Sequence, residues 1–402
     1  MSTGDELTAD PGAILLQLMA ADGRLPDGAA ANLPPLAWER IDGIARQHRL
    51  QPLLHHRTRH RRDIPASILD GWSEARRGGA AIALVQLAEL RATIALLESA
   101  DLHPVALKGA WLAWHIYPEP ALRPLRDIDL LLPPAEALAA YELLASHGYS
   151  VEEATELSLE DSLRLDKHLP PLVSPRGVPV ELHHRLWEID GRMDHSAPAA
   201  DECAFRDRCE RTGGILFPSP QDMLVHLIVH AAYDHRLDCG GLVLSDMAGL
   251  LHAFRIDWDL FWKDASARGY ERGARTLLAM VQRLYDSSVT ICWPKGQSGV
   301  PRPVLAAAGR LLFQDLATRQ SAGVYATATA GGWAKLLRRL RARRASAQEP
   351  GTTARELAGE GGYGMWALDR LKRTATDMSR RRVLEQGRDL AVMSRWLDRG
   401  VI

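Results

Sequence analysis

Two aspartates separated by one residue are the most chemically suggestive feature of the sequence. Asp127 and Asp129 lie in the segment R-D-I-D-L-L-L, whose apolar residues predict a buried strand over residues 127–132. Side chains two apart in a strand point to the same face, so both carboxylates would lie side by side. Like charges this close repel each other, and a bound cation would offset the repulsion. Mg²⁺ or Mn²⁺ is the expected ion, because hard oxygen ligands suit it and it also binds phosphates.

A lysine–glycine turn precedes this pair and supplies groups of the kind that bind phosphate. Lys108 and Gly109 follow the apolar run Val105–Leu107 and open an apolar helix that contains two tryptophans. Backbone N–H groups at such a helix start attract phosphate, and glycine allows a close approach. Arg123 and Arg126, in the proline-rich loop that follows, add positive charge for a triphosphate. The alternative is an ordinary turn followed by a solvated strand edge.

A third carboxylate stands inside the apolar segment V-P-V-E-L-H at residues 178–183. Alternation along a strand puts Val180 and Leu182 on one face and Glu181 and His183 on the other. An acid inside an otherwise apolar strand is costly unless it is paired or bound to a metal. Glu181 is therefore the expected third ligand beside the two aspartates, unless it faces water at a half-exposed position.

The elements around these residues indicate a small α+β core between two helical regions. Strands are expected at 105–107, 127–132, 149–153, 167–173 and 178–183, and the last two form a hairpin through S-P-R-G. Helices are expected at 135–147 and, in an acidic insertion, at 155–165. The chain then divides into an N-terminal helical region (1–100), a core (101–217) and a C-terminal helical region (218–402).

Composition excludes several classes of protein. The 402 residues carry a formal net charge of −1, so no global field steers the chain to nucleic acid or membrane. No stretch reaches the roughly eighteen consecutive apolar residues of a membrane span, and no signal peptide is evident. The four cysteines show no metal-ligand spacing, which indicates reduced thiols in a cytoplasmic protein.

Three other groups of residues are better explained by structure than by chemistry. His226, His230 and His235 lack the further ligands of a zinc site, so we expect core or hydrogen-bonded histidines. A basic run at residues 335–344 and a second at 380–382 would suit RNA, a membrane surface or an acidic partner. Few aromatic residues accompany these basic runs, so a solvated helix face is the preferred interpretation and nucleic acid is not an expected partner.

The pattern L-K-G, then R…D-I-D-L-L, then V-E-L-H resembles the bacterial family of uncharacterised nucleotidyltransferases, within the DNA-polymerase-β-like superfamily. The resemblance extends over roughly residues 35–290. It implies a small mixed-sheet polymerase-β-like core with helical flanks. It also implies that Lys108 and Gly109 form the triphosphate turn, with Asp127, Asp129 and Glu181 as ligands of two divalent ions. The superfamily's common turn is Gly-Ser or Gly-Gly, whereas Ala110 follows Gly109 here, so the serine hydroxyl is missing and Lys108 is its expected substitute.

The reaction implied by the resemblance is transfer of an NMP group from an NTP to a hydroxyl of a small molecule, a peptide or a protein. Asp129 and Glu181 would serve the acceptor side and Asp127 both ions, while Lys108, Arg123 and Arg126 would neutralise phosphate charge. His168 and His183 are expected to contact nucleotide or acceptor. The alternative is a catalytically inactive module of the same fold that binds nucleotide or a partner.

Overall fold

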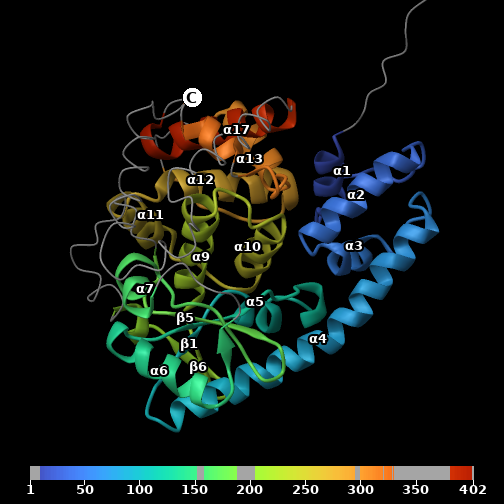
Figure 1. Ribbon diagram of the computed structural model, residues 1–402. Coiled ribbons are helices and arrows are strands. Elements are labelled where there is room, and N and C mark those ends of the chain that lie inside the picture. Colours follow the sequence, from blue (N-terminus) through green and yellow to red (C-terminus); the bar gives the residue numbers. More distant parts are fainter. Residues whose placement is uncertain are drawn as a thin grey trace, which may run out of the picture.

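The computed structural model describes residues 10–151, 158–187, 204–294, 299–319, 321–327, 329 and 381–400. Within these residues the fold is α+β, as the sequence predicts, with one seven-stranded mixed sheet. The sheet lies at one end of the molecule, and helices from before and after it cover the rest (Figure 1).

The strand order of the sheet is β3-β4-β5-β2-β1-β7-β6. β2 runs parallel to β5 and antiparallel to β1, which in turn runs parallel to β7. The central strands are buried because their residues are apolar, and all four residues of β2 are buried. The strands are β1 (Val105–Ala106), β2 (Ile128–Leu131), β3 (Ser150–Val151), β4 (Leu172–Val173), β5 (Pro179–His183), β6 (Glu210–Thr212) and β7 (Ile215–Phe217).

The structure confirms the predicted hairpin and the two predicted helices of the core. β4 and β5 form the expected antiparallel hairpin, with Val173 opposite Pro179. The expected helix after the second strand is α6 (Pro134–Ser146), and the acidic insertion contains α7 (Leu159–Leu165). The hairpin of β6 and β7 was not predicted. It turns at Gly213 and Gly214, both with positive φ, and adds β7 to the sheet beside β1.

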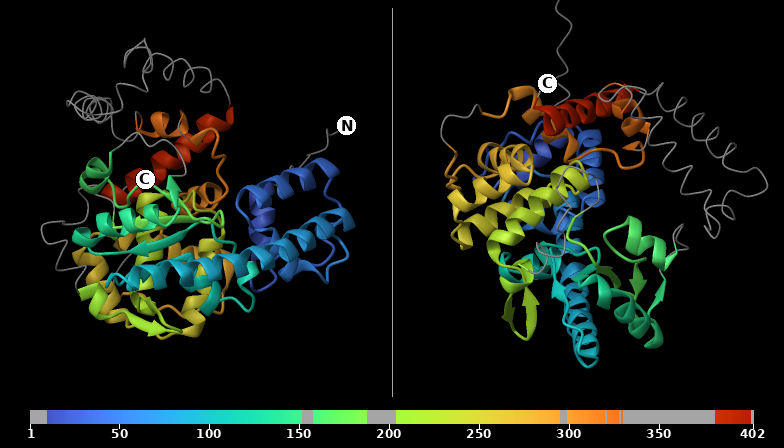
Figure 2. Two further views of the ribbon diagram at one scale, coloured as in Figure 1. Left: turned by 60° about the horizontal axis from the view of Figure 1, so that its bottom comes forward. Right: turned by 90° about the vertical axis from the view of Figure 1, so that its left-hand side faces the viewer.

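The N-terminal region is helical, as expected. Its helices are α1 (Pro11–Met19), α2 (Pro35–Gln47), α3 (Gln51–Thr58) and α4 (Ala66–Glu98). α4 packs against α3 near its start and against α6 farther along, so it joins the N-terminal helices to the core (Figure 2). The short helices α5 (Gly109–His115) and η1 (Pro120–Leu122) lie between β1 and β2 in the chain.

One helix in the described part of the chain, α4, has the length and apolar composition of a membrane span. The apolar residues of α4 are interrupted by Gln86, Glu89 and Arg91, so it is no run of eighteen consecutive apolar residues and no clear membrane span. Core helices of soluble proteins pass the same test, and α4 buries Trp72, Glu89 and Leu97 inside the molecule. Glu89 is paired there with Arg176 and accepts a hydrogen bond from Tyr149. These contacts agree with a packed helix.

The helices after β7 form a second layer that packs beside the sheet. They are α9 (Pro220–Val229), η2 (His230–Asp234), α10 (Leu242–Ala253), α11 (Trp258–Ala267), α12 (Glu271–Met280), η3 (Val281–Tyr285), α13 (Arg302–Leu311) and α17 (Arg381–Arg399). α9 begins at the cap Ser219, whose side chain accepts a hydrogen bond from the backbone N–H of Asp222, and it widens into a π-turn at His230–Asp234. α13 and α17 lie at the end farthest from the sheet (Figure 1). The basic run 335–344 and Arg380 lie outside the described residues.

Candidate active site

The pairing of β2 with β5 brings two of the predicted carboxylates together. Asp129 on β2 is the register partner of Glu181 on the parallel strand β5. Asp127 lies one residue before β2 begins, so the predicted strand is one residue shorter at this end. His183 shares the face of Glu181, two residues further along the same strand. The three acids and one histidine named from the sequence therefore meet in one place.

Hydrogen bonds hold Asp129 at the centre of this group. Its Oδ1 accepts from Lys108 Nζ at 2.8 Å and from His183 Nε2 at 2.8 Å. The same Nε2 lies 3.3 Å from Glu181 Oε2. One ligand atom each of Asp129, Glu181 and His183 lies within 4.8 Å of the other two, which is compact enough for a single metal ion. The set has two carboxylates and is joined by a third nearby, so it suits a hard divalent cation.

The acids have strongly different proton affinities because they are buried together. Burial and the negative charges of Asp129 and Glu181 raise the pKa of Asp127 to about 7. Burial also acts to raise the pKa of Asp129, but the Lys108 charge and the His183 hydrogen bond hold it well below its usual range. Near neutral pH and without a bound cation, the Asp127 carboxyl therefore holds its proton in a substantial fraction of molecules.

The turn before α5 is strained at Lys108. This residue adopts φ 44° and ψ −114°, an unusual conformation for a side chain other than glycine. The strain directs the ammonium group to Asp129, whereas the sequence led us to expect it near phosphate. α5 has only 7 residues, so its dipole is a small contribution to anion binding.

Gly109 allows a close approach, but the nearest groups belong to the protein. A Cβ at this position would lie 2.3 Å from Leu125 Cδ2 and 2.5 Å from Arg123 Nη1. We therefore expect Gly109→Ala to displace Arg123 and to lower the free energy of unfolding by about 1–3 kcal/mol, typical of overpacking. Denaturant unfolding measures this, with Gly43→Ala as control, since a Cβ at residue 43 meets nothing within 4 Å. Equal stability of the two variants would contradict the close packing.

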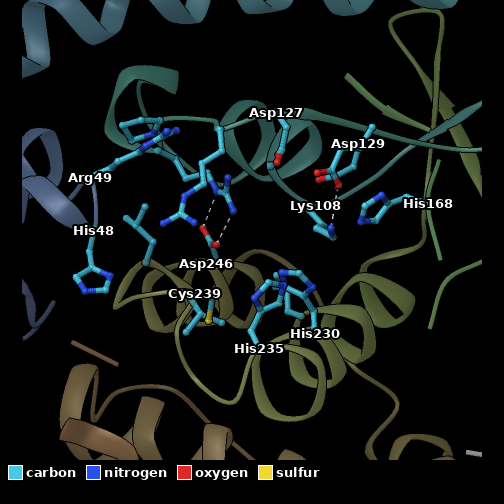
Figure 3. A pocket seen from close by; sticks show the side chains of 18 of the residues that line it. His48, Arg49, Lys108, Asp127, Asp129, His168, His230, His235, Cys239 and Asp246 are labelled. Atoms are coloured by element: carbon cyan, nitrogen blue, oxygen red, sulfur yellow. Dashed lines mark hydrogen bonds and ion pairs between the residues drawn. The ribbon is translucent and has the colours of Figure 1, made fainter. Parts of the chain in front are cut away.

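The site opens into a cavity of about 280 Å³ between the sheet and the helices after it. Figure 3 shows Lys108, Asp127 and Asp129 on the sheet side, and His230 and His235 on the helices opposite. Glu181 also lines the cavity, whereas His183 is only 1% exposed and lies behind the carboxylates. His183 is therefore placed to orient Asp129 and Glu181, not to touch a nucleotide directly.

The two predicted arginines differ in their surroundings. Arg123 forms two hydrogen bonds with the buried Asp246 of α10, at 3.2 and 3.1 Å, and Asp246 also accepts from Tyr117. Arg126 is exposed and makes no side-chain ion pair with any other residue described. Both arginines line the cavity, but only Arg126 has its charge free for a ligand.

The histidines are partly as expected. His226 is 2% exposed within α9, and His235 Nδ1 lies 2.8 Å from Asp238 Oδ1, so these are a core and a hydrogen-bonded histidine respectively. His230 and His235 also line the cavity, which the sequence did not indicate. His168 lines the cavity from the edge of the sheet, where it forms an isolated bridge to His183.

Several lining residues were not predicted from the sequence. Arg49 comes from the junction of α2 and α3, and Asp246 from α10. Lys167 also lines the cavity, and its Nζ lies 2.9 Å from Asp234 Oδ2. None of these residues belongs to a sequence motif, and no local signal marks Arg49 or Lys167. The helical position of Asp246 within an apolar run was the one visible hint, because a buried acid needs a partner.

Comparison with known proteins adds one finding to this geometry. A family model described as an uncharacterised nucleotidyltransferase matches residues 34–286, well over half of the chain. The match includes the turn at Lys108, the three acids and the helices that close the cavity. No curated protein and no solved structure matches the chain.

Proposed function

The chain belongs to the family of uncharacterised nucleotidyltransferases, and from this premise we propose that it moves an NMP group from an NTP to a hydroxyl acceptor with the help of divalent metal ions. The observation that carries the proposal is the group of three acids at the cavity. The pKa of Asp127 is raised to about 7 by burial and by its acidic neighbours, which is the signature of a site built for a cation.

The chain's own residues supply distinct parts of such a reaction. Asp127, Asp129 and Glu181 would hold Mg²⁺ or Mn²⁺, and His183 orients Asp129 and Glu181 through Nε2. When bound, the metal lowers the pKa of the acceptor hydroxyl and neutralises charge on the leaving pyrophosphate. Arg126 contributes positive charge for the phosphates.

The bond changes follow from the substrates. The acceptor oxygen forms a bond to the α-phosphorus, and the bond from that phosphorus to the bridging oxygen breaks, so pyrophosphate leaves. The hydroxyl proton passes to solvent in the open cavity. As part of the same proposal, the acceptor is a small molecule, a peptide or a protein, and the reaction takes place in the cytoplasm.

Ligand binding and transfer are tested separately. We expect Mg²⁺ with at least one of ATP, GTP, CTP and UTP to raise the melting temperature by several degrees, because a ligand that binds only the folded state stabilises it. NTPs labelled at the α-phosphate, incubated with cell lysate and the protein, should transfer label in Mg²⁺ but not in EDTA. No thermal shift with any NTP, in Mg²⁺ or in Mn²⁺, would contradict the site.

The Lys108–Asp129 ion pair favours a second candidate function. The ammonium group already neutralises one carboxylate of the site, and the turn lacks the serine hydroxyl usual in the superfamily. A catalytically inactive module that binds nucleotide would tolerate both features. If the protein is such an inactive module, an NTP should raise its melting temperature but no label should be transferred under any condition. This result would distinguish the module from the enzyme.

A further inference from the structure

The end of the cavity nearest the N-terminal helices carries positive charge without a partner. Of the lining cations, Lys108, Arg123 and Lys167 each pair with a buried aspartate. Arg49 and Arg126 pair with no carboxylate in the described part of the chain. The charges in the cavity are therefore separated, with Asp127 and Asp129 at the sheet and Arg49 on the side of the N-terminal helices (Figure 3).

Arg49 occupies a backbone position that normally belongs to glycine. Helix α2 ends in a Schellman motif: the backbone N–H of Leu50 donates to Ala45 O at 2.8 Å, and that of Arg49 donates to Arg46 O at 3.1 Å. The residue between the helix and Leu50 must be left-handed, and Arg49 has φ 56°. A side chain in this conformation costs free energy that glycine would avoid, and such strain gathers at functional sites.

The strained backbone aims the Arg49 side chain into the cavity, where one hydrogen bond fixes it. Arg49 Nη1 donates to Leu125 O at 2.8 Å, in the loop just before Arg126. A guanidinium group has five N–H donors, so most of them stay available to a ligand. The contact with Leu125 places Arg49 next to Arg126, and burial and the charge of Arg126 lower the pKa of Arg49.

Two adjacent guanidinium groups, one of them held by a hydrogen bond, beside an acidic site that suits a metal ion fit one class of ligand. Arginine binds phosphate through paired N–H donors, and a chain of phosphates can span from the acids to the arginines. We propose that Arg49 and Arg126 form a polyphosphate subsite that holds the β- and γ-phosphates of the NTP, so that the N-terminal helical region completes the active site. This inference rests on the proposed function, because it assigns the phosphate end of the same substrate.

Inorganic tripolyphosphate in excess EDTA tests the subsite without metal, nucleoside or transfer. We expect the full-length protein to bind it, as measured by calorimetry and by a raised melting temperature. Arg49→Gly and Arg126→Gln should each weaken binding by about tenfold or more, the usual effect of losing hydrogen bonds to a charged group. Arg46→Gln is the matched control: Arg46 lies one turn earlier in α2, is exposed, and pairs only with Asp42 among the described residues.

Arg49→Gly also separates a ligand role from a structural one. Glycine suits the left-handed position, so the unliganded variant should melt at the same temperature as the wild type or higher, while its tripolyphosphate binding falls. A clear fall in melting temperature with unchanged binding would overturn the proposal. So would an absence of tripolyphosphate binding to the wild type, or an equal loss in Arg46→Gln. If label transfer persists in such a case, the proposed function stands and only the subsite fails.

Discussion

Asp129→Asn is expected to abolish nucleotidyl transfer, by about a thousandfold or more, because a ligand to the catalytic metal supplies several kcal/mol of transition-state stabilisation. The same substitution should also destabilise the metal-free protein. Asp129 is 4% exposed and accepts hydrogen bonds from Lys108 and His183, and removing its charge leaves a buried ammonium group without a counter-ion. A loss of about 3 kcal/mol in the free energy of unfolding is expected in EDTA.

From the sequence alone the sign depends on the role of Asp129. If Asp129 is a metal ligand that only repels Asp127, neutralising it should leave metal-free stability unchanged or raise it. If it is instead paired with Arg123 or Arg126, the same change should destabilise the protein. The structure gives Asp129 a partner that the sequence did not indicate: Lys108 Nζ lies 2.8 Å from Asp129 Oδ1, so we expect destabilisation. The attraction between Lys108 and Asp129, at short distance and with little exposure, outweighs the repulsion from Asp127, which is only partly ionised near pH 7.

A double substitution identifies the ion pair as the cause. Lys108→Met combined with Asp129→Asn removes both charges, so it should recover most of the stability that Asp129→Asn loses. Denaturant unfolding curves of the wild type, both single variants and the double variant in EDTA measure the coupling. Additive losses would mean that Lys108 and Asp129 do not interact in solution. Full transfer activity in Asp129→Asn would refute its role as a ligand.

The central strands of the fold could be predicted because their signals are local. The apolar runs at residues 105–107 and 127–132, and the S-P-R-G turn before β5, each specify an element without help from the rest of the chain. The β6–β7 hairpin was missed although Gly213–Gly214 between two short strands is a usual hairpin turn. Strands of three residues carry little periodicity, so only the turn could have revealed them.

The acids of the site were predictable for the same reason, as were Lys108, Arg123 and Arg126, but Arg49 and the partners of these cations were not. Asp129 and Glu181 interrupt apolar strands, where an unpaired acid is costly. Arg49 follows the end of α2 and Asp246 lies on α10, on opposite sides of the core in the sequence, and only the folded chain brings them to one cavity. The partner of Arg123 could not be inferred either, since its bidentate pairing with Asp246 depends on how α10 packs against the loop.

Asp127→Asn is expected to stabilise the metal-free protein at high pH while abolishing transfer. Burial and its acidic neighbours raise the pKa of Asp127 to about 7, whereas an unfolded chain has the ordinary value of 3.8. The folded state therefore binds this proton more tightly, and wild-type stability falls as pH rises between the two values. Asparagine carries no such penalty. The gain in free energy of unfolding of Asp127→Asn over the wild type should be absent below about pH 4 and grow toward neutrality. It should reach on the order of 2 kcal/mol at pH 8, which is less than the full pKa shift implies because the Asp127 side chain is partly exposed.

Divalent metal should reverse this ranking, which links the stability of Asp127 to its proposed role. Metal binding requires the ionised carboxylate, so Mg²⁺ should stabilise the wild type more at pH 8 than at pH 6. Asp127→Asn should gain little stability from Mg²⁺ at either pH.

His183 titrates in the same pH range as Asp127. Burial and Lys108 act to lower its pKa, but its hydrogen bonds to Asp129 and Glu181 raise it overall. The stability that protonated His183 contributes is therefore lost as pH rises through this raised pKa. The pH dependence that remains in Asp127→Asn includes His183 and the other buried histidines, and the difference from the wild type isolates Asp127. Unfolding curves at pH 4, 6 and 8, with Mg²⁺ and with EDTA, measure both effects. A pH-independent gain in Asp127→Asn would show that this carboxyl does not keep its proton in the folded site, and the electrostatic argument for a cation there would fail with it.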